Sequence, residues 1–188
     1  MNIPQLEELE GLEAARVLLR LDLNVPLGAG SVLDTSRVEA ALPTVEHLLD
    51  AGAVVAVGSH LGDPRGQRRA ALSLEPVSRV LADLIGRRMT FLPGCVGDQV
   101  RRSVQDADPG SLLMLENLRF EPGEPANDDD FAVALAAPFS HYVNDAFGAA
   151  HRNHASVAGV PRRFARGRRA AGRLVQMEVD AITCLMAR

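Results

Sequence analysis

The 188-residue sequence has no lysine and no tryptophan, and it has two cysteines and one tyrosine. All 20 of its basic side chains are therefore arginines. The lack of lysine excludes a Walker-type phosphate loop, a Schiff base and the strand lysine of protein kinases. Any anion chemistry must use arginine, histidine and backbone amides. Arginine suits that task, because its planar fork binds phosphate or carboxylate through two hydrogen bonds.

The two cysteines, Cys95 and Cys184, lie far apart and show no ligand spacing. This pattern argues against a disulfide framework and against a zinc site, and we expect no metal. Two ordinary thiols in a reducing compartment are the simpler interpretation. The acidic N-terminus lacks the basic start of a signal peptide, and no apolar run reaches the ~18 residues that span a bilayer. We therefore expect a cytoplasmic protein that does not bind membranes.

The length fits one domain well and two full domains poorly. Apolar residues make up 47% of the chain and charged residues 23%, which is typical of a globular protein and excludes wholesale disorder. The net charge of −4 argues against a general nucleic-acid binder.

Short apolar runs alternate with amphipathic helical patterns along the chain. Several runs are continuous rather than alternating, as in strands buried on both faces. The runs are Val17 to Leu23, Ala53 to Gly58, Met89 to Leu92, Ser111 to Leu115 and His141 to Val143. Strand and helix in alternation predict an α/β fold with a parallel sheet and right-handed crossovers.

Four helices are expected between and after these runs. Pro43 is expected to bend or restart the first. Ser73 is expected to cap the second, which Gly86 ends. The others are a short helix capped by Asn127 and a longer one over 172–186.

Polar side chains follow four of the apolar runs. These segments are Asp22 to Pro26, Ser59 to Gly62, Glu116 to Phe120 and Asn144 to His154. Open parallel sheets bind ligands outside the carboxyl ends of their strands. A single segment of this kind is an ordinary loop that satisfies backbone groups, but four that carry arginine and histidine favour a small anionic ligand. Arg37, in the first turn of the following helix, is placed to join them.

A further stretch, from Pro161 to Arg173, is rich in arginine. Its arginines are Arg162, Arg163, Arg166, Arg168, Arg169 and Arg173. A solvated basic surface is the simpler interpretation, and a patch that binds a polyanion is the alternative.

Several segments also match a known family. Leu19 to Pro26 (LRLDLNVP) resembles the first signature of phosphoglycerate kinase. Further blocks match in the family's order: SHLG at 59–62, SLEPV at 73–77, LENLRF at 115–120 and VNDAFGAAHR at 143–152. The resemblance runs from about Arg16 to about Ile182. It implies a Rossmann-like parallel sheet with helices on both faces, in three α/β/α layers, equivalent to the family's N-terminal, substrate-binding domain over residues 1–188.

The resemblance also implies a site for 3-phosphoglycerate. Arg37 would be catalytic, because it would bind the reacting end and steady the transferring phosphoryl group. Asp22 and Asn24 would contact the carboxylate and hydroxyl region. His60, Arg119 and Arg152 would hold the substrate's phosphate. The full set of expected substrate contacts is Asp22, Asn24, Arg37, His60, Asp63, Arg119 and Arg152, and the surrounding basic patch is Arg20, His151 and His154. Phosphoryl transfer needs such positioning and charge neutralisation.

The sequence departs from the family directly after Gly62. The family has Arg-Pro at that point, whereas this chain has Asp63-Pro64. A carboxylate beside a phosphate costs on the order of a few kcal/mol at an effective dielectric of ~20. Arg65 would compensate if the loop bends differently. The alternative is a relaxed or altered site.

The family has a second domain that carries the nucleotide and Mg²⁺. This chain ends near the helix that leads into it, so we expect that the C-terminal nucleotide-binding domain is absent and that Mg-ATP or Mg-ADP binds only when that domain is supplied. Three hypotheses follow. The chain is the substrate half of a phosphotransferase that interconverts 1,3-bisphosphoglycerate and 3-phosphoglycerate in glycolysis, inactive without a separate C-terminal domain. Alternatively, it is a degenerate paralogue that binds anions without catalysis, or an interaction protein that uses Arg162 to Arg173.

Overall fold

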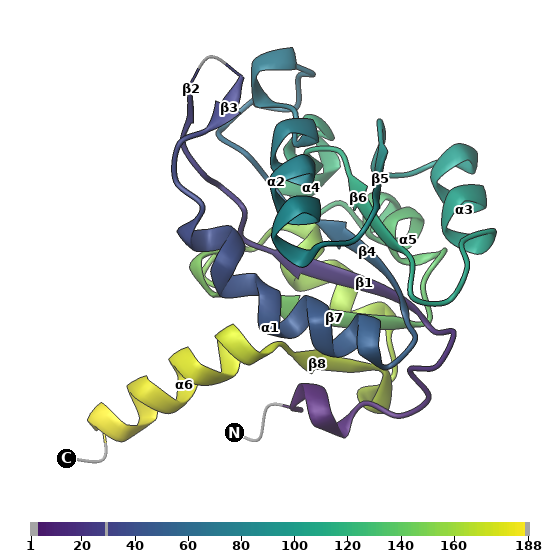
Figure 1. The fold of residues 1–188 in the computed structure, drawn as a ribbon, viewed down its shortest axis with the longest axis vertical. Coiled ribbons are helices and arrows are strands. Elements are labelled where there is room, and N and C mark those ends of the chain that lie inside the picture. Colours follow the sequence, from purple (N-terminus) through teal and green to yellow (C-terminus); the bar gives the residue numbers. More distant parts are fainter. Residues whose placement is uncertain (1–3, 29, 187–188) are drawn as a thin grey trace.

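A six-stranded parallel sheet runs through the computed structural model, which describes residues 4–28 and 30–186 (Figure 1). In spatial order its strands are β5 (Met89–Leu92), β6 (Leu112–Leu115), β4 (Val54–Gly58), β1 (Arg16–Leu21), β7 (His141–Asp145) and β8 (Arg169–Ala171). Every pairing in this sheet is parallel. Strands β2 (Leu27–Gly28) and β3 (Ser31–Val32) form a separate small antiparallel pair. Residues 1–3, 29, 187 and 188, part of the domain expected over 1–188, lie outside the described ranges.

The central strands are buried on both faces, which explains their continuous apolar sequence. In β4 every residue is buried. Val55 and Val57 pack into the core on one face of the sheet, and Val54 and Ala56 pack into the core on the other. Strands in this position need apolar side chains in both directions, so they do not alternate with polar residues.

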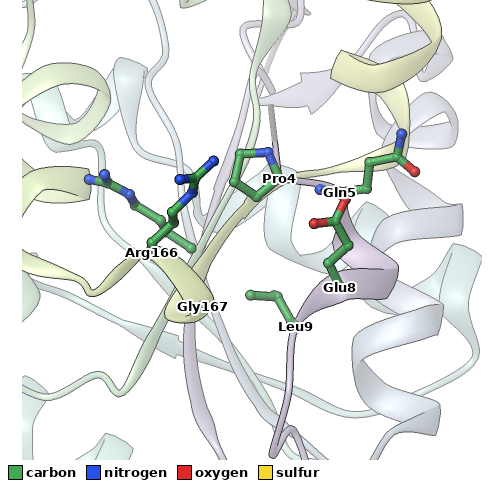
Figure 2. Close-up of a pocket in the computed structure, with 7 residues that line it drawn as sticks. Pro4, Gln5, Glu8, Leu9, Arg166 and Gly167 are labelled. Carbon is green, nitrogen blue, oxygen red and sulfur yellow. Dashed lines mark hydrogen bonds between the residues drawn. The ribbon is translucent and has the colours of Figure 1, made fainter. Parts of the chain in front are cut away.

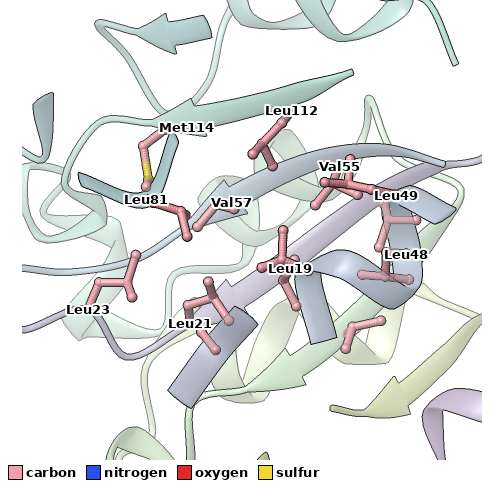
Figure 3. Close-up of a cluster of buried hydrophobic side chains, with 14 of the residues drawn as sticks. Leu19, Leu21, Leu23, Leu48, Leu49, Val55, Val57, Leu81, Leu112 and Met114 are labelled. Atoms are coloured by element: carbon pink, nitrogen blue, oxygen red, sulfur yellow. The ribbon is translucent and has the colours of Figure 1, made fainter. Parts of the chain in front are cut away.

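Helices cover both faces of the sheet, so the expected three-layer α/β/α fold is confirmed. On one face lie α1 (Ser36–Asp50), α2 (Glu75–Ile85) and α6 (Arg173–Met186). Figure 3 shows Leu48 and Leu49 of α1 and Leu81 of α2 gathered with strand side chains such as Val57 in this core. The opposite layer holds α3 (Asp98–Gln105), α4 (Gly123–Ala126), α5 (Asp129–Ala136) and a π-helical turn at Ala155–Gly159.

The first helix, expected to bend or restart at Pro43, does not restart there, because α1 continues through Pro43 from Ser36 to Asp50. Buried side chains on either side of the proline, Ala41 and Val45, hold the helix against the sheet. This packing offsets the lost hydrogen bond.

Asn127 does not cap a helix N-terminus. It ends α4 in the left-handed conformation, with φ of 52°. The next residue, Asp128, caps α5 by accepting a hydrogen bond from the amide of Phe131 at 2.8 Å. Asparagine tolerates the left-handed region, which suits the end of a helix.

The ends of α2 agree with the expectation that Ser73 caps this helix and Gly86 ends it. The Ser73 hydroxyl accepts a hydrogen bond from the amide of Glu75 at 3.2 Å, and Gly86 ends the helix with a φ of +67°. Within the described ranges, no helix is both long and apolar enough to cross a lipid bilayer.

Candidate functional site

The four polar segments meet at one edge of the sheet, as the sequence predicts. Strands β6, β4, β1 and β7 are neighbours in that order and run in parallel. Their carboxyl ends therefore lie side by side, and each is followed by one of the segments. This edge is where open α/β sheets bind ligands.

One cluster at this edge is built around Asp22 and Arg37. Arg37, the second residue of α1, donates a hydrogen bond from Nη1 to Oδ2 of Asp22 at 2.5 Å. The Arg37 side chain stays 53% exposed, whereas that of Asp22 is 11% exposed. A Cβ atom at Gly148 would collide with the Asp22 carboxylate and lie 3.6 Å from Nη1 of Arg37. Any side chain at 148 would therefore displace the Asp22 carboxylate from this position.

Gly62 joins this cluster to a second one. Its amide donates to Oδ1 of Asn24 at 2.8 Å, and its carbonyl oxygen accepts from Nη1 of Arg119 at 2.7 Å. Gly62 has a φ of +60°, and an added Cβ would lie 2.9 Å from Leu72. Both observations favour glycine here. The amide of Gly66 donates to the carbonyl oxygen of Arg119 at 3.2 Å, so Arg119 holds the loop 62–66 at both ends.

The second cluster surrounds a pocket of about 230 Å³, which we call the anion pocket. Its lining residues are Asp63, Arg65, Gly66, Arg119, Pro125, Arg152 and His154. Three arginines face one carboxylate, so the lining carries a net positive charge. Guanidinium groups in this number favour an anion with several acceptor oxygens.

Arg119 has unused hydrogen-bonding capacity at this pocket. The residue is 8% exposed, and within the described part of the chain its Nε and Nη2 atoms are buried without a hydrogen-bond partner. Burial, followed by the neighbouring charges of Arg152 and Arg20, lowers the pKa of Arg119. Buried donors without partners are costly, so Nε and Nη2, which together carry three N–H groups, make Arg119 a candidate to bind an anion at this pocket.

Two of the expected site residues are buried beneath the pocket rather than lining it. Arg20, expected in the surrounding basic patch, is 1% exposed. Its guanidinium donates to Oγ of Ser156 at 2.8 Å, to Nδ1 of His60 at 3.1 Å and to the carbonyl oxygen of Leu21. His60 is also buried, and burial together with the charges of Arg20 and Arg119 lowers its pKa to about 2. The imidazole of His60 is therefore neutral at physiological pH.

The remaining expected patch residues lie on the loop after β7. His154 lines the anion pocket, and burial lowers its pKa. His151 is exposed and is not among the lining residues.

The carboxylate and amide of the LENLRF segment shape the loops instead of lining the pocket. Glu116 is buried and accepts hydrogen bonds from the amide of Leu74 and the hydroxyl of Ser73, both at 2.9 Å. Asn117 donates to the carbonyl oxygens of Leu61 at 2.7 Å and Leu72 at 3.0 Å. Of this segment, Arg119 alone is among the residues that line the anion pocket.

The arginine-rich stretch is largely engaged by the fold itself. Arg163 pairs with Asp129, Arg168 donates to His141 at 3.0 Å, and Arg173 pairs with Glu7 at 3.2 Å. Arg169 begins β8 and donates to the carbonyl oxygen of Pro161 at 2.6 Å. Figure 2 shows the hollow beside this stretch, about 290 Å³ in volume, with Glu8 across from Arg166. The structure accounts for four of the six arginines without a polyanion.

Sequence reasoning missed Glu124 and Ser156, which are buried next to the pocket. Glu124 lies in an acidic stretch with the composition of a solvated turn. Neither the residue nor its neighbours in the sequence therefore predict that its side chain is buried. Among residues 4–28 and 30–186, no three His, Cys, Asp or Glu side chains are grouped so as to hold a metal ion.

Comparison with known proteins identifies relatives across almost the whole chain. The family model described as phosphoglycerate kinase matches residues 6–188. The phosphoglycerate kinase of Moorella thermoacetica is 50% identical over 177 residues, which cover 94% of this chain and 44% of the relative. That of Thermomicrobium roseum is 47% identical over 171 residues, or 91% of this chain and 43% of the relative.

Solved structures give the same result. The structure of phosphoglycerate kinase from Coxiella burnetii has a TM-score of 0.84 and 32% identity, covering 97% of this chain and 44% of that chain. The one from Pyrococcus horikoshii OT3 has a TM-score of 0.87 and 29% identity, covering 96% of this chain and 45% of that chain. This chain thus spans less than half the length of these relatives.

Proposed function

The chain belongs to the phosphoglycerate kinase family, and from this premise we propose that its anion pocket binds the phosphate of 3-phosphoglycerate or 1,3-bisphosphoglycerate. In this proposal the chain supplies the substrate side of phosphoryl transfer with ADP and ATP in cytoplasmic glycolysis. The observation that carries it is Arg119, whose Nε and Nη2 are buried beside the pocket without a partner in the described part of the chain. Two phosphate oxygens would accept from Nε and Nη2, because a guanidinium fork binds two acceptors at once.

The other site residues have distinct tasks in this proposal. Arg152 and His154 would neutralise the remaining phosphate oxygens, since both line the pocket. Arg37 would contact the reacting end of the substrate, because half of its side chain is exposed while its Nη1 is held by Asp22. The protein would position the substrate and offset its charge, which is what phosphoryl transfer requires.

The nucleotide and Mg²⁺ of the family do not fit the residues described here. Glu116 accepts from Ser73 and Leu74, and Asp145 accepts from the amide of Val175 through Oδ1. Although Oδ2 of Asp145 has no partner in the described part of the chain, no three His, Cys, Asp or Glu side chains there are grouped so as to hold a metal ion. The pocket itself is lined by cations, which repel Mg²⁺. We therefore derive no step through the nucleotide or the metal and assign both to the family's C-terminal domain.

Calorimetric titration with 3-phosphoglycerate tests the binding role. We expect weak binding that is lost in Arg37→Ala, Arg119→Ala and Arg152→Ala. Arg79→Ala is the matched control, because Arg79 pairs with Glu75 on the exposed side of α2. Unchanged affinity in all three site variants would contradict the proposal.

A coupled assay tests the catalytic role. The 188-residue chain is mixed with ATP and 3-phosphoglycerate, with and without a separately produced phosphoglycerate kinase C-terminal domain. We expect turnover only when that domain is added. Turnover by the purified chain alone would show that the nucleotide site has been assigned wrongly.

Asp63 supports a second candidate, a non-catalytic anion-binding module. Its carboxylate lines the pocket and opposes an incoming phosphate. Binding of 3-phosphoglycerate or inorganic phosphate without turnover, even when the C-terminal domain is supplied, would favour this candidate.

A further inference from the structure

Glu124 is completely buried directly behind two residues that line the anion pocket. Its neighbour Pro125 lines the pocket, and its Oε1 lies 4.0 Å from Nδ1 of the lining residue His154. Both carboxylate oxygens are used by one residue. Oε2 accepts from the amide of Ser156 at 2.8 Å, and Oε1 accepts from the Ser156 hydroxyl at 2.6 Å. A buried carboxylate persists only when it is hydrogen-bonded and compensated in this way.

The compensating charge is Arg20, and Ser156 connects the two. Oγ of Ser156 donates its proton to Glu124 and accepts a hydrogen bond from Nε of Arg20 at 2.8 Å. Burial lowers the pKa of Arg20, and the charge of Glu124 is the largest influence that opposes this shift. Arg20 and Glu124 thus form a buried ion pair bridged by a hydroxyl group.

The far end of Arg20 sets the protonation pattern of His60. Arginine is a donor only, so Nδ1 of His60 must accept the 3.1 Å hydrogen bond from Nη2. A neutral imidazole that accepts at Nδ1 carries its proton on Nε2. His60 therefore offers one N–H donor at Nε2, and its ring orientation depends on Arg20.

The segment around Glu124 also holds the loop that carries Arg152. Asn127, directly after α4, donates from Nδ2 to Oδ1 of Asn153 at 3.3 Å. The Ser156 carbonyl oxygen accepts from the Tyr142 hydroxyl at 2.7 Å, which ties the following turn to β7. The loop is thus fixed at Asn153, directly after Arg152, and at Ser156, two residues after His154, by residues behind the pocket.

We propose that Glu124 is a positioning residue for the anion pocket. Through Ser156 and Arg20 it fixes the tautomer and orientation of His60, and through its two hydrogen bonds to Ser156 it holds the loop that presents Arg152. The proposal rests on the proposed function, because it takes the ligand of the pocket to be a phosphorylated acid. It goes further because it makes the geometry of the cationic pocket depend on the buried Glu124 carboxylate, which does not line the pocket.

Electrostatics alone predicts the opposite result to positioning, and this makes the test decisive. Removing a negative charge behind a cationic pocket would by itself strengthen the binding of an anion. If Glu124 acts by positioning, Glu124→Gln weakens 3-phosphoglycerate binding at least tenfold, a change of about 1.4 kcal/mol. Stronger or unchanged binding in a folded Glu124→Gln variant would overturn the proposal.

A second readout needs no ligand. In the wild-type chain we expect ¹⁵N NMR to show His60 with the proton on Nε2. In Glu124→Gln and in Ser156→Ala, which cuts the bridge but keeps both charges, we expect a mixture of tautomers. Ser156→Ala also covers the case in which Glu124→Gln fails to fold. Glu121→Gln, which removes a charge just before α4, is the matched control and should leave both readouts unchanged.

The two readouts separate failure of this inference from failure of the proposed function. If the variants alter the His60 tautomer but not even the wild-type chain binds 3-phosphoglycerate, the proposed ligand is wrong and the link from Glu124 to His60 stands. If the wild-type chain binds 3-phosphoglycerate and both variants keep the tautomer and the affinity, Glu124 is not a positioning residue.

Discussion

Arg119 donates a hydrogen bond from Nη1 to the carbonyl oxygen of Gly62 at 2.7 Å, and its own carbonyl oxygen accepts one from the amide of Gly66 at 3.2 Å. The same side chain lines the anion pocket, and its Nε and Nη2 have no hydrogen-bond partner in the described part of the chain. The order of the loop 62–66 and the binding of an anion are thus coupled through one guanidinium. Loss of this group should affect both.

Arg119→Ala is expected to lower the affinity for 3-phosphoglycerate by ~1.5–3 kcal/mol, the usual range for a hydrogen bond to a charged group. Because the contact to Gly62 is lost as well, amides of the loop 62–66 should exchange hydrogen faster. Calorimetry and hydrogen exchange measure the two effects. Arg79→Ala should change neither, and a loss of affinity without faster exchange would show that Arg119 does not hold the loop.

Gly62→Ala is expected to destabilise the domain, because left-handed backbone costs a residue with a side chain on the order of 1–3 kcal/mol. Gly86→Ala is the matched control. Gly86 has a similar φ of +67°, but nothing lies within 4 Å of an added Cβ, whereas at Gly62 the Cβ would lie 2.9 Å from Leu72. Urea unfolding should show the larger loss for Gly62→Ala. Only that variant should also weaken 3-phosphoglycerate binding. Equal losses in the free energy of unfolding would show that Leu72 moves aside at no cost.

The convergence of the polar segments could be predicted from the sequence, because parallel strands place their carboxyl ends at one edge. Burial of individual polar residues could not. Arg20 lies within an apolar run, and its surroundings depend on Ser156, which is 136 residues later in the sequence. Strand β8 could not be predicted for a related reason. Arg169 lies in an arginine-rich stretch that is typical of a solvated surface, but its backbone pairs with β7.

The limits of the helices depend on contacts that act across the fold. Asn127 and Asp128 are both good capping residues, and the choice between them follows from α4, which needs a left-handed residue at its end. Helix α3 was not predicted, because it is short and mostly polar, with Val100 and Val104 as its buried contacts. Such a helix is stabilised by the core it covers more than by its own sequence.

His60 is expected to make the stability of the domain depend on pH. Its pKa is about 2 when folded, against an ordinary value of 6.5, so below pH 6.5 the unfolded chain binds a proton that the folded chain does not. The free energy of unfolding should therefore fall as the pH falls below 6.5, with a contribution from His60 of up to ~1.4 kcal/mol per pH unit. Urea unfolding between pH 7 and pH 5 measures this slope.

The variant His60→Gln isolates that contribution. His141 and His154 also have lowered pKa values and add to the slope in both proteins, so the difference between wild type and variant reports His60 alone. We expect a shallower slope in His60→Gln. Identical slopes would show that the folded protein protonates His60 near its ordinary pKa.

The last prediction concerns Asp63, which stands where the family has an arginine. Asp63 and Arg65 both line the anion pocket, and Nε of Arg65 lies 3.8 Å from Oδ2 of Asp63. Their side chains are 72% and 82% exposed respectively, and such an exposed pair contributes ~0–1 kcal/mol, so Arg65 is free to turn to a ligand. Arg65 also has a φ of 56°, in the left-handed region that a residue with a side chain seldom adopts. We therefore expect that Arg65 fills the place of the missing arginine.

Arg65→Ala should weaken 3-phosphoglycerate binding about tenfold, equivalent to ~1.4 kcal/mol. Arg69→Ala, which changes an arginine outside the pocket lining, should leave the affinity unchanged. Asp63→Asn should strengthen binding a few-fold, and this gain should shrink as salt screens the charges. Asp63→Arg should then add little beyond Asp63→Asn. A tenfold gain in Asp63→Arg together with an unaffected Arg65→Ala would instead identify a damaged site that Arg65 does not repair. If neither position alters the affinity, the loop 62–66 does not touch the ligand, and the phosphate must bind to Arg119 and Arg152 from another direction.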